Sequence, residues 1–419
     1  MKRLLMIAYH FPPLAGSSGI QRTLRFVQHL PSYGWQPIVL TVQARAYART
    51  SPDLDVQVPT SVAVRRAFAL DAARQLAIGG RYPGMLARPD RWMSWRLDGL
   101  RQGMRLMREF RPDALWSTYP IATAHVIGAD LQRRTGLPWV ADFRDPMAQP
   151  DYPDDPKTRA AFSAIEQRAA RQAQRLCFTT PSAAATYRLR YPDAANRMTV
   201  LENGFDEESF RVAETSPDYR TALNPGRKTL LHSGTIYLAE RDPTHLLAAL
   251  AILKSARPDL AQDLQLRFRA PVHEDQLRSL AASHGVTDLI EVLPPIGYGE
   301  ALVEMLRADG LLVLQASNCN EQVPAKIYEY MRAGRPIVSL SDPKGDTCAV
   351  LRGAGVTRHG RLDSATEIAE ILLRFLAADV AGLVPLPESV GAASRAARTA
   401  QLAGLLNDCV TPKPVAGAH

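Results

Sequence analysis

The feature that most constrains the fold is a regular alternation of short apolar runs and helical stretches in the first half of the chain. Helical patterns separate most of the runs, as at 18–34, where Ser18 is a candidate N-cap and Gly34 follows the end. Strands that alternate with helices predict a parallel sheet with both faces covered. The strand-length runs occupy residues 3–9, 37–42, 62–67, 113–118, 138–143, 175–180 and 198–203.

This alternation stops and then restarts, which divides the chain. Residues 207–227 lose periodicity and gain polar and turn residues, so we expect an interdomain linker there. An α/β domain is expected at 1–206 and a second at 228–387, as the length of 419 residues suggests. Residues 388–409 have a helical pattern, and 410–419 are expected to form a flexible tail. The strand-length runs of the second domain occupy residues 228–234, 264–270, 289–294, 310–316 and 336–340.

Charge and cysteine usage limit the partners and the compartment. The chain has 50 Lys and Arg against 42 Asp and Glu, and this net charge of +8 favours an anionic partner: nucleic acid, anionic lipid or a phosphorylated substrate. Four cysteines without CxxC spacing and nine histidines without HxxxH or HExxH pairing predict neither a disulfide framework nor a protein-held metal. No run approaches the roughly 18 apolar residues that span a bilayer, so we expect a cytoplasmic protein.

The loop after the first strand is the first candidate ligand site. Gly16 and Gly19 lie where a strand turns into a helix, and small residues there let backbone N–H groups approach an anion or a sugar. The spacing is not GxGxxG, and a tight turn without a ligand is the alternative. "WVADFRDP" places Asp142, Arg144 and Asp145 at the C-terminal end of a predicted strand, where open α/β sheets bind ligands. A structural salt bridge of the acids to Arg144 is the alternative there.

The second domain repeats this arrangement of strand, glycine turn and helix. Gly234 and Thr235 form the turn, and Arg241 precedes a helix that Asp242 or Thr244 could cap. A positive side chain beside free backbone N–H groups suits a diphosphate.

The segment "EQVPAKIYEYMRAG" combines two acids with a lysine. Pro324 is a favourable first-turn residue for a helix that Gly334 would end, and Lys326 and Glu329 are then neighbours on one helix face. Glu321 lies in the loop before this helix. A carboxylate accepts hydrogen bonds from vicinal hydroxyls, whereas a lysine at a helix N-terminus favours phosphate. A nucleotide sugar presents both kinds of group.

These segments, in this order, resemble landmarks of the GT-B glycosyltransferases of family 4. "EQVPAKIYEYMRAGRPIV" is similar to the E-x7-E region of that family, and "HFPPLAGSSGIQR", "ADFRDP", "VLENGFD" and "HSGTIY" followed by "RDP" are similar to further landmarks. The resemblance covers most of residues 1–405. It implies two Rossmann-like domains that face across a cleft, with 1–206 on the acceptor side and 228–387 binding the donor. The helix at 388–409 is a candidate to cross back to the N-terminal domain.

The resemblance also implies the roles of single residues in a retaining transferase that uses a nucleotide-diphosphate sugar. Catalytic roles fall on Asp145, Glu321 and Arg241, with Glu321 at the transferred sugar. Glu329 would hold the nucleotide ribose, and Arg241 with Lys326 would face the diphosphate. Electrostatic stabilisation of this leaving group would require neither a metal nor a cofactor. The donor-binding residues implied are Gly16, Gly19, Gly234, Thr235, Lys326 and Glu329.

The chain departs from the family pattern at two places. Many members carry an HD or HE pair where this chain has Arg144 and Asp145, so Asp145 is the candidate for the group near the reacting centre. No lysine closely follows Arg241, so the usual arginine-lysine pair is half matched. Candidate residues on the acceptor side are His10, Asp142 and Arg144.

Residues 88–111 place arginines among tryptophan, leucine and methionine side chains. A basic amphipathic helix of this kind suits an anionic membrane surface and, with it, a polyprenyl-linked acceptor. The alternative is a helix that faces the core and exposes a basic side. No recognised nucleic-acid motif accompanies the arginines, so we expect no nucleic-acid partner.

The leading hypothesis is a hexosyltransferase that acts on a glycan or lipid-linked acceptor in cell-surface polysaccharide biosynthesis. The inner face of the plasma membrane is a candidate location. A GT-B-fold nucleotide-sugar epimerase or hydrolase is the enzyme alternative. A catalytically silent, glycosyltransferase-like binding protein is the alternative of a different class.

Overall fold

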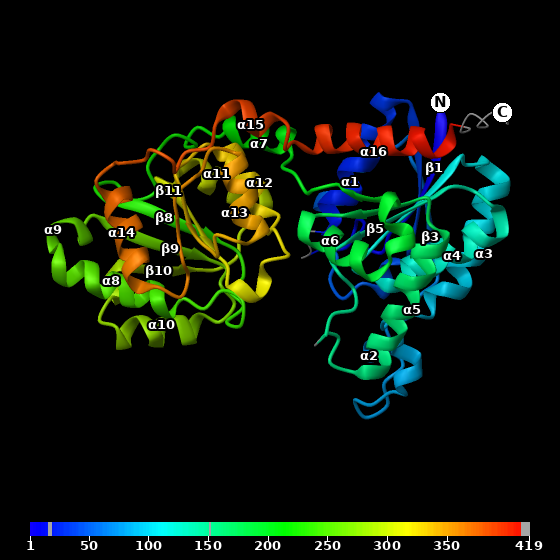
Figure 1. The fold of residues 1–419 in the computed structure, drawn as a ribbon, viewed down its shortest axis with the longest axis horizontal. Helices are drawn as coiled ribbons and strands as arrows, with labels where there is room; N and C mark the ends of the chain where they lie inside the picture. Colours follow the sequence, from blue (N-terminus) through cyan, green and yellow to red (C-terminus); the bar gives the residue numbers. More distant parts are fainter. Residues whose placement is uncertain (16–18, 151, 412–419) are drawn as a thin grey trace. The chain divides into compact units, whose positions relative to one another are not determined.

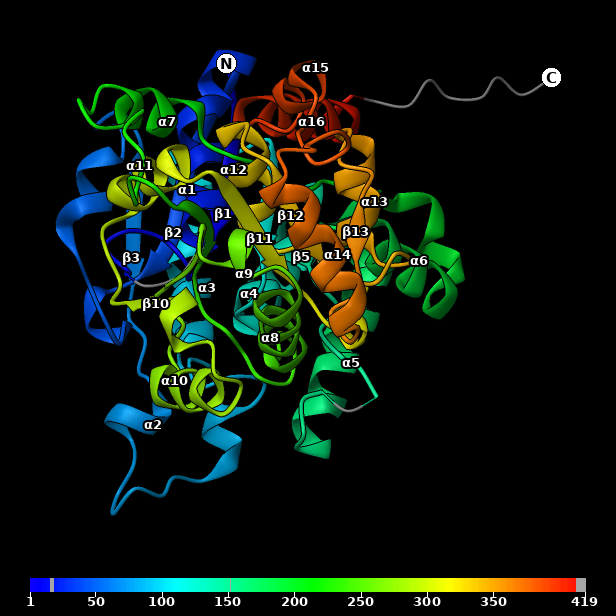
Figure 2. The same cartoon turned by 90° about the vertical axis from the view of Figure 1, so that its left-hand side faces the viewer.

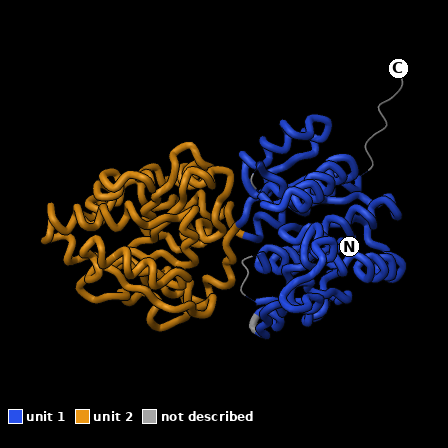
Figure 3. Tube along the Cα trace, turned by 90° about the horizontal axis from the view of Figure 1, so that it is seen from below, with its two compact units in different colours: residues 1–203, 395–419 blue, residues 204–394 orange. Residues whose placement is uncertain are grey.

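The structure, a computed structural model, describes residues 1–15, 19–150 and 152–411 and divides into two compact units (Figures 1 and 3). Unit 1 comprises Met1–Asn203 and the chain from Arg395 onward, and unit 2 is Gly204–Ser394. The chain thus returns to unit 1 at its C-terminal helix, as expected. The expected linker at 207–227 is wrong, because helix α7 (Glu207–Glu214) lies in unit 2 and buries Phe210 in its core.

Unit 1 contains a seven-stranded sheet in the order β3-β2-β1-β4-β5-β6-β7, and each neighbouring pair is parallel. Every strand predicted in this half of the chain is present. The strand order reverses between β1 and β4, which is where open α/β sheets bind ligands. The strands are β1 (Lys2–Ile7), β2 (Trp35–Val42), β3 (Ala63–Ala67), β4 (Ala114–Thr118), β5 (Trp139–Arg144), β6 (Arg175–Phe178) and β7 (Met198–Val200).

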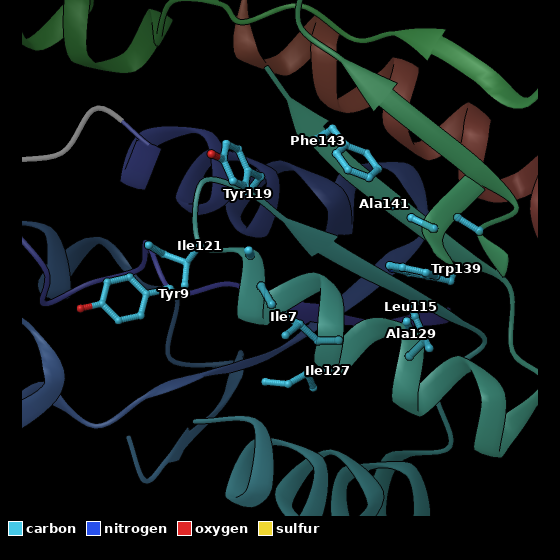
Figure 4. Packing of buried hydrophobic residues seen from close by; sticks show 14 of the residues in the cluster. Ile7, Tyr9, Leu115, Tyr119, Ile121, Ile127, Ala129, Trp139, Ala141 and Phe143 are labelled. Atoms are coloured by element: carbon cyan, nitrogen blue, oxygen red, sulfur yellow. The ribbon is translucent and has the colours of Figure 1, made fainter. Parts of the chain in front are cut away.

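Helices cover both faces of this sheet, because both faces of its strands are apolar. In β1, Leu5 and Ile7 belong to one buried cluster, shown in part in Figure 4, while Leu4 and Met6 belong to another. Helix α3 packs on α4, and α16 packs on α1. The helices of unit 1 are α1 (Gly19–His29), α2 (Ala72–Gln75), α3 (Trp95–Phe110), α4 (Ala122–Thr135), α5 (Pro156–Gln172), α6 (Pro181–Arg190) and α16 (Arg395–Val410).

Unit 2 contains a six-stranded sheet in the order β10-β9-β8-β11-β12-β13, also parallel throughout. The predicted strands of this half are all present, and the short β13 was not predicted. The order reverses between β8 and β11, so this pair marks the ligand edge of unit 2. The strands are β8 (Lys228–Ser233), β9 (Leu264–Arg269), β10 (Ile290–Leu293), β11 (Gly310–Leu314), β12 (Ile337–Leu340) and β13 (His359–Gly360).

Two buried clusters lie on the two faces of this second sheet. Helix α14 packs beside α8 on one face, as Figure 2 shows, and α11 packs on α7 and α12 on the other. The remaining helices of unit 2 are α8 (Thr244–Ala256), α9 (Pro258–Ala261), α10 (Glu274–Ser283), α11 (Tyr298–Arg307), α12 (Lys326–Ala333), α13 (Asp346–Gly353), α14 (Ala365–Leu376) and α15 (Pro387–Gly391).

The C-terminal helix differs from its expected bounds of 388–409. It is divided into α15 and α16, and α16 continues to Val410, the first residue of the expected tail. Within the described part of the chain, no helix is both long and apolar enough to cross a membrane.

Candidate functional site

The ligand edge of unit 1 brings His10, Gly19 and Arg144 together from three parts of the sequence. Gly19 is the first residue of α1, and a Cβ atom there would lie 2.5 Å from His10 Nδ1 and 2.8 Å from Arg144 Nη1. A side chain at this position would therefore force His10 or Arg144 to move, and the glycine lets the three residues meet as they do. The other predicted glycine of this loop, Gly16, lies outside the described residues.

Arg144 has an unusual backbone at the end of β5. Its φ is 64°, in the left-handed region that favours glycine, and the β5–β6 register shifts between Asp142 and Arg144. Backbone strain of this kind is often found at functional sites. The Arg144 Nη1 donates to the Tyr119 carbonyl at 3.3 Å, while Nε has no partner among the described residues.

The charges at this edge favour an anion. Burial, and after it the nearby Arg144, lower the pKa of His10 to about 3. His10 is therefore neutral at pH 7, next to a guanidinium and to the N-terminus of α1. A neutral imidazole, a cation and the N-terminus of a helix form a site that suits a phosphate or another anionic group.

Asp142, predicted on the acceptor side, is instead part of a buried ion pair. Its side chain is fully buried and accepts hydrogen bonds from Arg22 Nε at 2.9 Å, Arg22 Nη2 at 2.8 Å and Thr118 Oγ1 at 2.9 Å. Both carboxylate oxygens are thus used inside the protein, and contact with an acceptor is excluded in this arrangement. The salt-bridge alternative predicted Arg144 as the partner of Asp142, but its partner is Arg22.

Asp145 remains at the edge of the sheet. It is partly exposed, and its Oδ1 accepts from Thr179 Oγ1 at 3.2 Å. The side chain is therefore accessible and oriented by one hydrogen bond, as a group near a reacting centre should be.

In unit 2 the glycine turn after β8 meets the start of α12. Lys326 is the first residue of α12, and its Nζ lies 2.8 Å from His232 Nε2 and 3.1 Å from the Ser233 carbonyl. The Tyr330 hydroxyl, one helical turn further along α12, accepts a hydrogen bond from the Ser233 amide at 2.9 Å. This second contact also fixes the glycine turn. Gly234 has a φ of 113°, which only glycine adopts readily.

Arg241 is held against this turn. Its Nη1 donates to the Thr235 carbonyl at 2.7 Å, and its guanidinium lies 5.2 Å from the Tyr237 ring centroid. The N-cap of α8 is Pro243, and not Asp242 or Thr244 as predicted, although Asp242 Oδ1 accepts from the Thr244 amide at 2.9 Å. The turn thus carries a cation beside a helix N-terminus.

The two acids of the E-x7-E segment occupy different environments. Glu329 is partly buried, and the Tyr298 hydroxyl at the start of α11 donates to its Oε1 at 2.9 Å. Glu321 is exposed in the loop before α12, as predicted. Helix α12 ends at Gly334, whose φ of 67° is left-handed, as the sequence indicated.

Lys326 and Glu329 share one face of α12, as their spacing predicted. Burial lowers the pKa of Lys326 well below its ordinary value, and Arg241 lowers it further, while Glu329 raises it. The three charged groups of this edge therefore interact with one another before any ligand binds.

Two cavities lie elsewhere in unit 2. One of about 620 Å³ extends over the ends of β11, β12 and β13, and one of about 270 Å³ lies between α8 and α10. Neither is lined by Glu321, Lys326 or Glu329. These three residues therefore lie outside both of these cavities.

Four contacts were not foreseen from the sequence. Arg22 and Thr118 bind Asp142, and Tyr298 and His232 bind Glu329 and Lys326. Arg22 lies inside the "GSSGIQR" segment and His232 inside "HSGTIY", so both belong to segments already singled out. Their partners are distant in sequence, and only the fold could identify them.

Comparison with known proteins agrees with these motifs. Residues 18–204 match the family model "Glycosyl transferase 4-like domain". The D-inositol 3-phosphate glycosyltransferase of Streptomyces scabiei (strain 87.22) is 28% identical over 200 residues, 45% of this chain and 43% of that protein. The chain thus spans less than half the length of this curated relative.

Solved structures resemble the whole chain at low identity. Sucrose-phosphate synthase from Thermosynechococcus elongatus has a TM-score of 0.67 at 14% identity, over 97% of this chain and 99% of that one. Anabaena HepE in complex with UDP-glucose has a TM-score of 0.63 at 14% identity, over 97% of this chain and 100% of that one. The expected GT-B fold is thereby confirmed, and the match of residues 18–204 to a glycosyl transferase 4-like domain agrees with it.

Proposed function

We propose that the chain is a retaining glycosyltransferase that moves a hexose-type sugar from a nucleotide-diphosphate sugar to a glycan or lipid-linked acceptor. The observation that carries the proposal is the arrangement at the β8–α12 edge. There Lys326 lies at the start of α12, Arg241 lies on the adjoining turn, and Glu329 lies on the same helix face as Lys326. The cations suit phosphate oxygens, and the carboxylate suits the vicinal hydroxyls of a ribose, so the arrangement fits both parts of a nucleotide.

The proposed mechanism relies on electrostatic stabilisation of the leaving group. Negative charge develops on the diphosphate as the sugar departs, and Arg241, Lys326 and the N–H groups that begin α12 can stabilise it. Glu321 would orient the sugar, and the acceptor would attack from the face that the nucleotide leaves, so that the anomeric configuration is kept. Asp145 is the proposed side chain beside the reacting centre. These cations can perform the role without a further cofactor.

Similar proteins support the donor class. Anabaena HepE was solved with UDP-glucose, and the curated relatives are named D-inositol 3-phosphate glycosyltransferases. The base of the donor, the sugar and the acceptor of this chain are separate questions, because fold similarity does not fix them.

The proposal for the acceptor class and the location is less specific than the proposal for the donor. A role in cell-surface polysaccharide biosynthesis, at the inner face of the plasma membrane, would bring the +8 chain to an anionic surface. The tryptophans of 88–111 do not serve this contact, since Trp95 is fully buried and Trp92 packs against the core. Here the core-facing alternative is the correct one. A membrane contact would use exposed arginines of α3 such as Arg101.

A thermal-shift panel of UDP, GDP and dTDP tests the proposal first. A rise in the unfolding temperature with one of them supports a nucleotide site and identifies the base, because a ligand that binds only the folded state stabilises it. If none of the three changes the unfolding temperature, the proposed function is wrong.

Two variants then separate binding from transfer. Glu329→Ala should weaken nucleotide binding, whereas Glu321→Ala should keep nucleotide affinity and lose sugar transfer. Full activity in both variants would refute the site assignment. A silent binding protein would bind nucleotide without transfer, and an epimerase or hydrolase would convert the nucleotide sugar without any acceptor.

A further inference from the structure

His232 forms a close pair with Lys326, and the proposed mechanism gives this histidine no role. His232 lies near the end of β8, is fully buried, and places its Nε2 2.8 Å from Lys326 Nζ. Its Nδ1 is also buried and has no hydrogen-bond partner among the described residues. The Nε2 contact with Lys326 is therefore the side-chain hydrogen bond of this ring within the described part of the chain.

The protonation of the pair follows from its surroundings. Burial lowers the pKa of His232 well below its ordinary value, and Lys326 and Arg241 lower it further. The ring is thus neutral, with a lone pair on one nitrogen and a proton on the other. When Lys326 is protonated its ammonium has no lone pair, so His232 Nε2 is then the acceptor of this hydrogen bond.

Several charged or titratable groups face the Lys326 amine. From β8 and its turn these are His232 and Arg241, with the Ser233 carbonyl as a further acceptor, and from α12 the group is Glu329. Burial and Arg241 lower the pKa of Lys326, and Glu329 raises it. An incoming diphosphate would add negative charge beside this amine and favour its protonated form.

We propose that His232 is a positioning residue for Lys326: it orients the lysine amine toward the donor diphosphate, and diphosphate binding is coupled to uptake of one proton by that amine. The inference rests on the proposed function, because it needs a nucleoside diphosphate at this edge. The proton comes from solvent and is bound by Lys326 Nζ, and His232 Nε2 remains the acceptor. A lysine has four rotatable side-chain bonds, so an acceptor that fixes its amine reduces the entropy lost on binding.

The coupling gives the nucleotide affinity a defined pH dependence. Above the pKa of Lys326 in the free protein, binding must first protonate the amine, so affinity falls by up to about tenfold per pH unit. The effect is best measured from about pH 8 to 9.5, where the phosphates, with a second pKa near 6, no longer titrate.

Isothermal titration calorimetry with the nucleoside diphosphate selected by the thermal-shift panel tests the inference. Titrations in two buffers of different ionisation enthalpy report the protons taken up. The wild type should take up a fraction of a proton that approaches one as the pH rises, and Lys326→Met should take up none. His232→Leu should bind about twofold to tenfold more weakly, which is the loss of one hydrogen bond, and His232→Gln should recover most of the affinity through its amide oxygen.

The controls separate this inference from the proposed function. His284→Leu, at the C-terminus of α10, should bind as the wild type does. No binding by the wild type at any pH would refute the proposed function itself. Binding by the wild type with equal affinity in His232→Leu, or with equal proton uptake in Lys326→Met, would overturn the inference and leave the proposed function standing. If His232→Leu does not fold, His232→Gln and Lys326→Met still test the inference, because unchanged proton uptake in Lys326→Met contradicts the coupling.

Discussion

At the scale of the residue, Gly19 shows that a position without a side chain leaves room for two other residues to approach each other. In a helix, alanine is more stable than glycine by about 1 kcal/mol, so Gly19→Ala would be stabilising if only the helix mattered. A Cβ atom would, however, lie 2.5 Å from His10 Nδ1 and 2.8 Å from Arg144 Nη1. We expect a loss of about 1–3 kcal/mol of unfolding free energy, as for overpacking elsewhere.

Denaturant unfolding checks this prediction with a matched control in the same unit. Gly404 lies in α16, and no atom comes within 4 Å of a Cβ atom built there. Gly404→Ala should therefore gain about 0.5–1 kcal/mol. A gain in both variants would contradict the close approach of His10 and Arg144 to Gly19.

His125 makes stability depend on pH in a predictable direction. The ring is fully buried, its Nδ1 contacts Ser117 Oγ at 2.7 Å, and burial lowers its pKa from 6.5 to about 4. The unfolded chain binds a proton below about pH 6.5, whereas the folded chain does not until about pH 4. Stability from this residue is therefore complete above pH 6.5 and is lost as the pH falls toward 4.

The unfolding free energy, followed from pH 7 to 4, measures the effect. His125→Gln should reduce the slope in this window by up to about 1.4 kcal/mol per pH unit. His10 and His359, whose pKa values burial lowers to about 3 and about 4, contribute in the same direction and retain part of the slope. An unchanged slope in His125→Gln would show that this histidine is protonated, or accessible, in the folded state.

The residue scale also shows what the sequence could and could not reveal. Lys326 and Glu329 were predicted to share a helix face, because a spacing of three is fixed by helix geometry. The pairing of Asp142 with Arg22 was not predicted, because the two residues lie on separate elements that meet only in the folded sheet. A sequence shows that an acid ends a strand, but not whether that acid points into the protein or out of it.

At the scale of the element, the strands were predictable and one helix was ambiguous. The central strand runs, such as β1, β4 and β11, are mostly apolar, so their burial could be predicted without the tertiary fold. In α3 the same arginine and tryptophan pattern fits a membrane surface and a protein core. Gly99 and Gly103 decide between them, since a Cβ atom there would lie 2.6 Å from Ile127 and 2.8 Å from Leu131 in α4. The two helices approach closely at these glycines, and α3 therefore faces the core.

Helix α16 gives an element-scale prediction. It follows all of unit 2 in sequence, yet its Leu402 and Leu406 are fully buried with Leu4 and Trp35 of unit 1. Each buried leucine contributes about 2–5 kcal/mol. A chain that ends at Ser394 should therefore lose stability in unit 1, although the cut lies after unit 2.

Hydrogen exchange followed by mass spectrometry tests this prediction region by region. Peptides from β1 and α1 should exchange faster in the chain that ends at Ser394, and peptides from α8 and α14 should not change. A chain that ends at Thr411 keeps α16 and should behave as the full chain does. Equal loss of protection in both units would mean that α16 does not stabilise unit 1 specifically.

At the scale of the whole molecule, the two units repeat one construction. Each has a parallel sheet whose order reverses at a central pair of strands, and unit 2 places Gly234 and Lys326 at that reversal. The alternation of strands and helices predicted both sheets, and the ordered motifs indicated the GT-B fold. The exact division of the chain was not predicted, because polar composition at 207–227 does not distinguish a linker from the surface of α7.

The central claim is that the edge of unit 2 at Lys326 and Glu329 binds the nucleotide of a sugar donor. The most direct measurement is a crystal structure of the chain with the nucleoside diphosphate that stabilises it. We predict that the ribose hydroxyls bind Glu329 and that the diphosphate contacts Lys326 and Arg241. A nucleotide bound elsewhere in the molecule, with Glu329 and Lys326 untouched, would contradict the account.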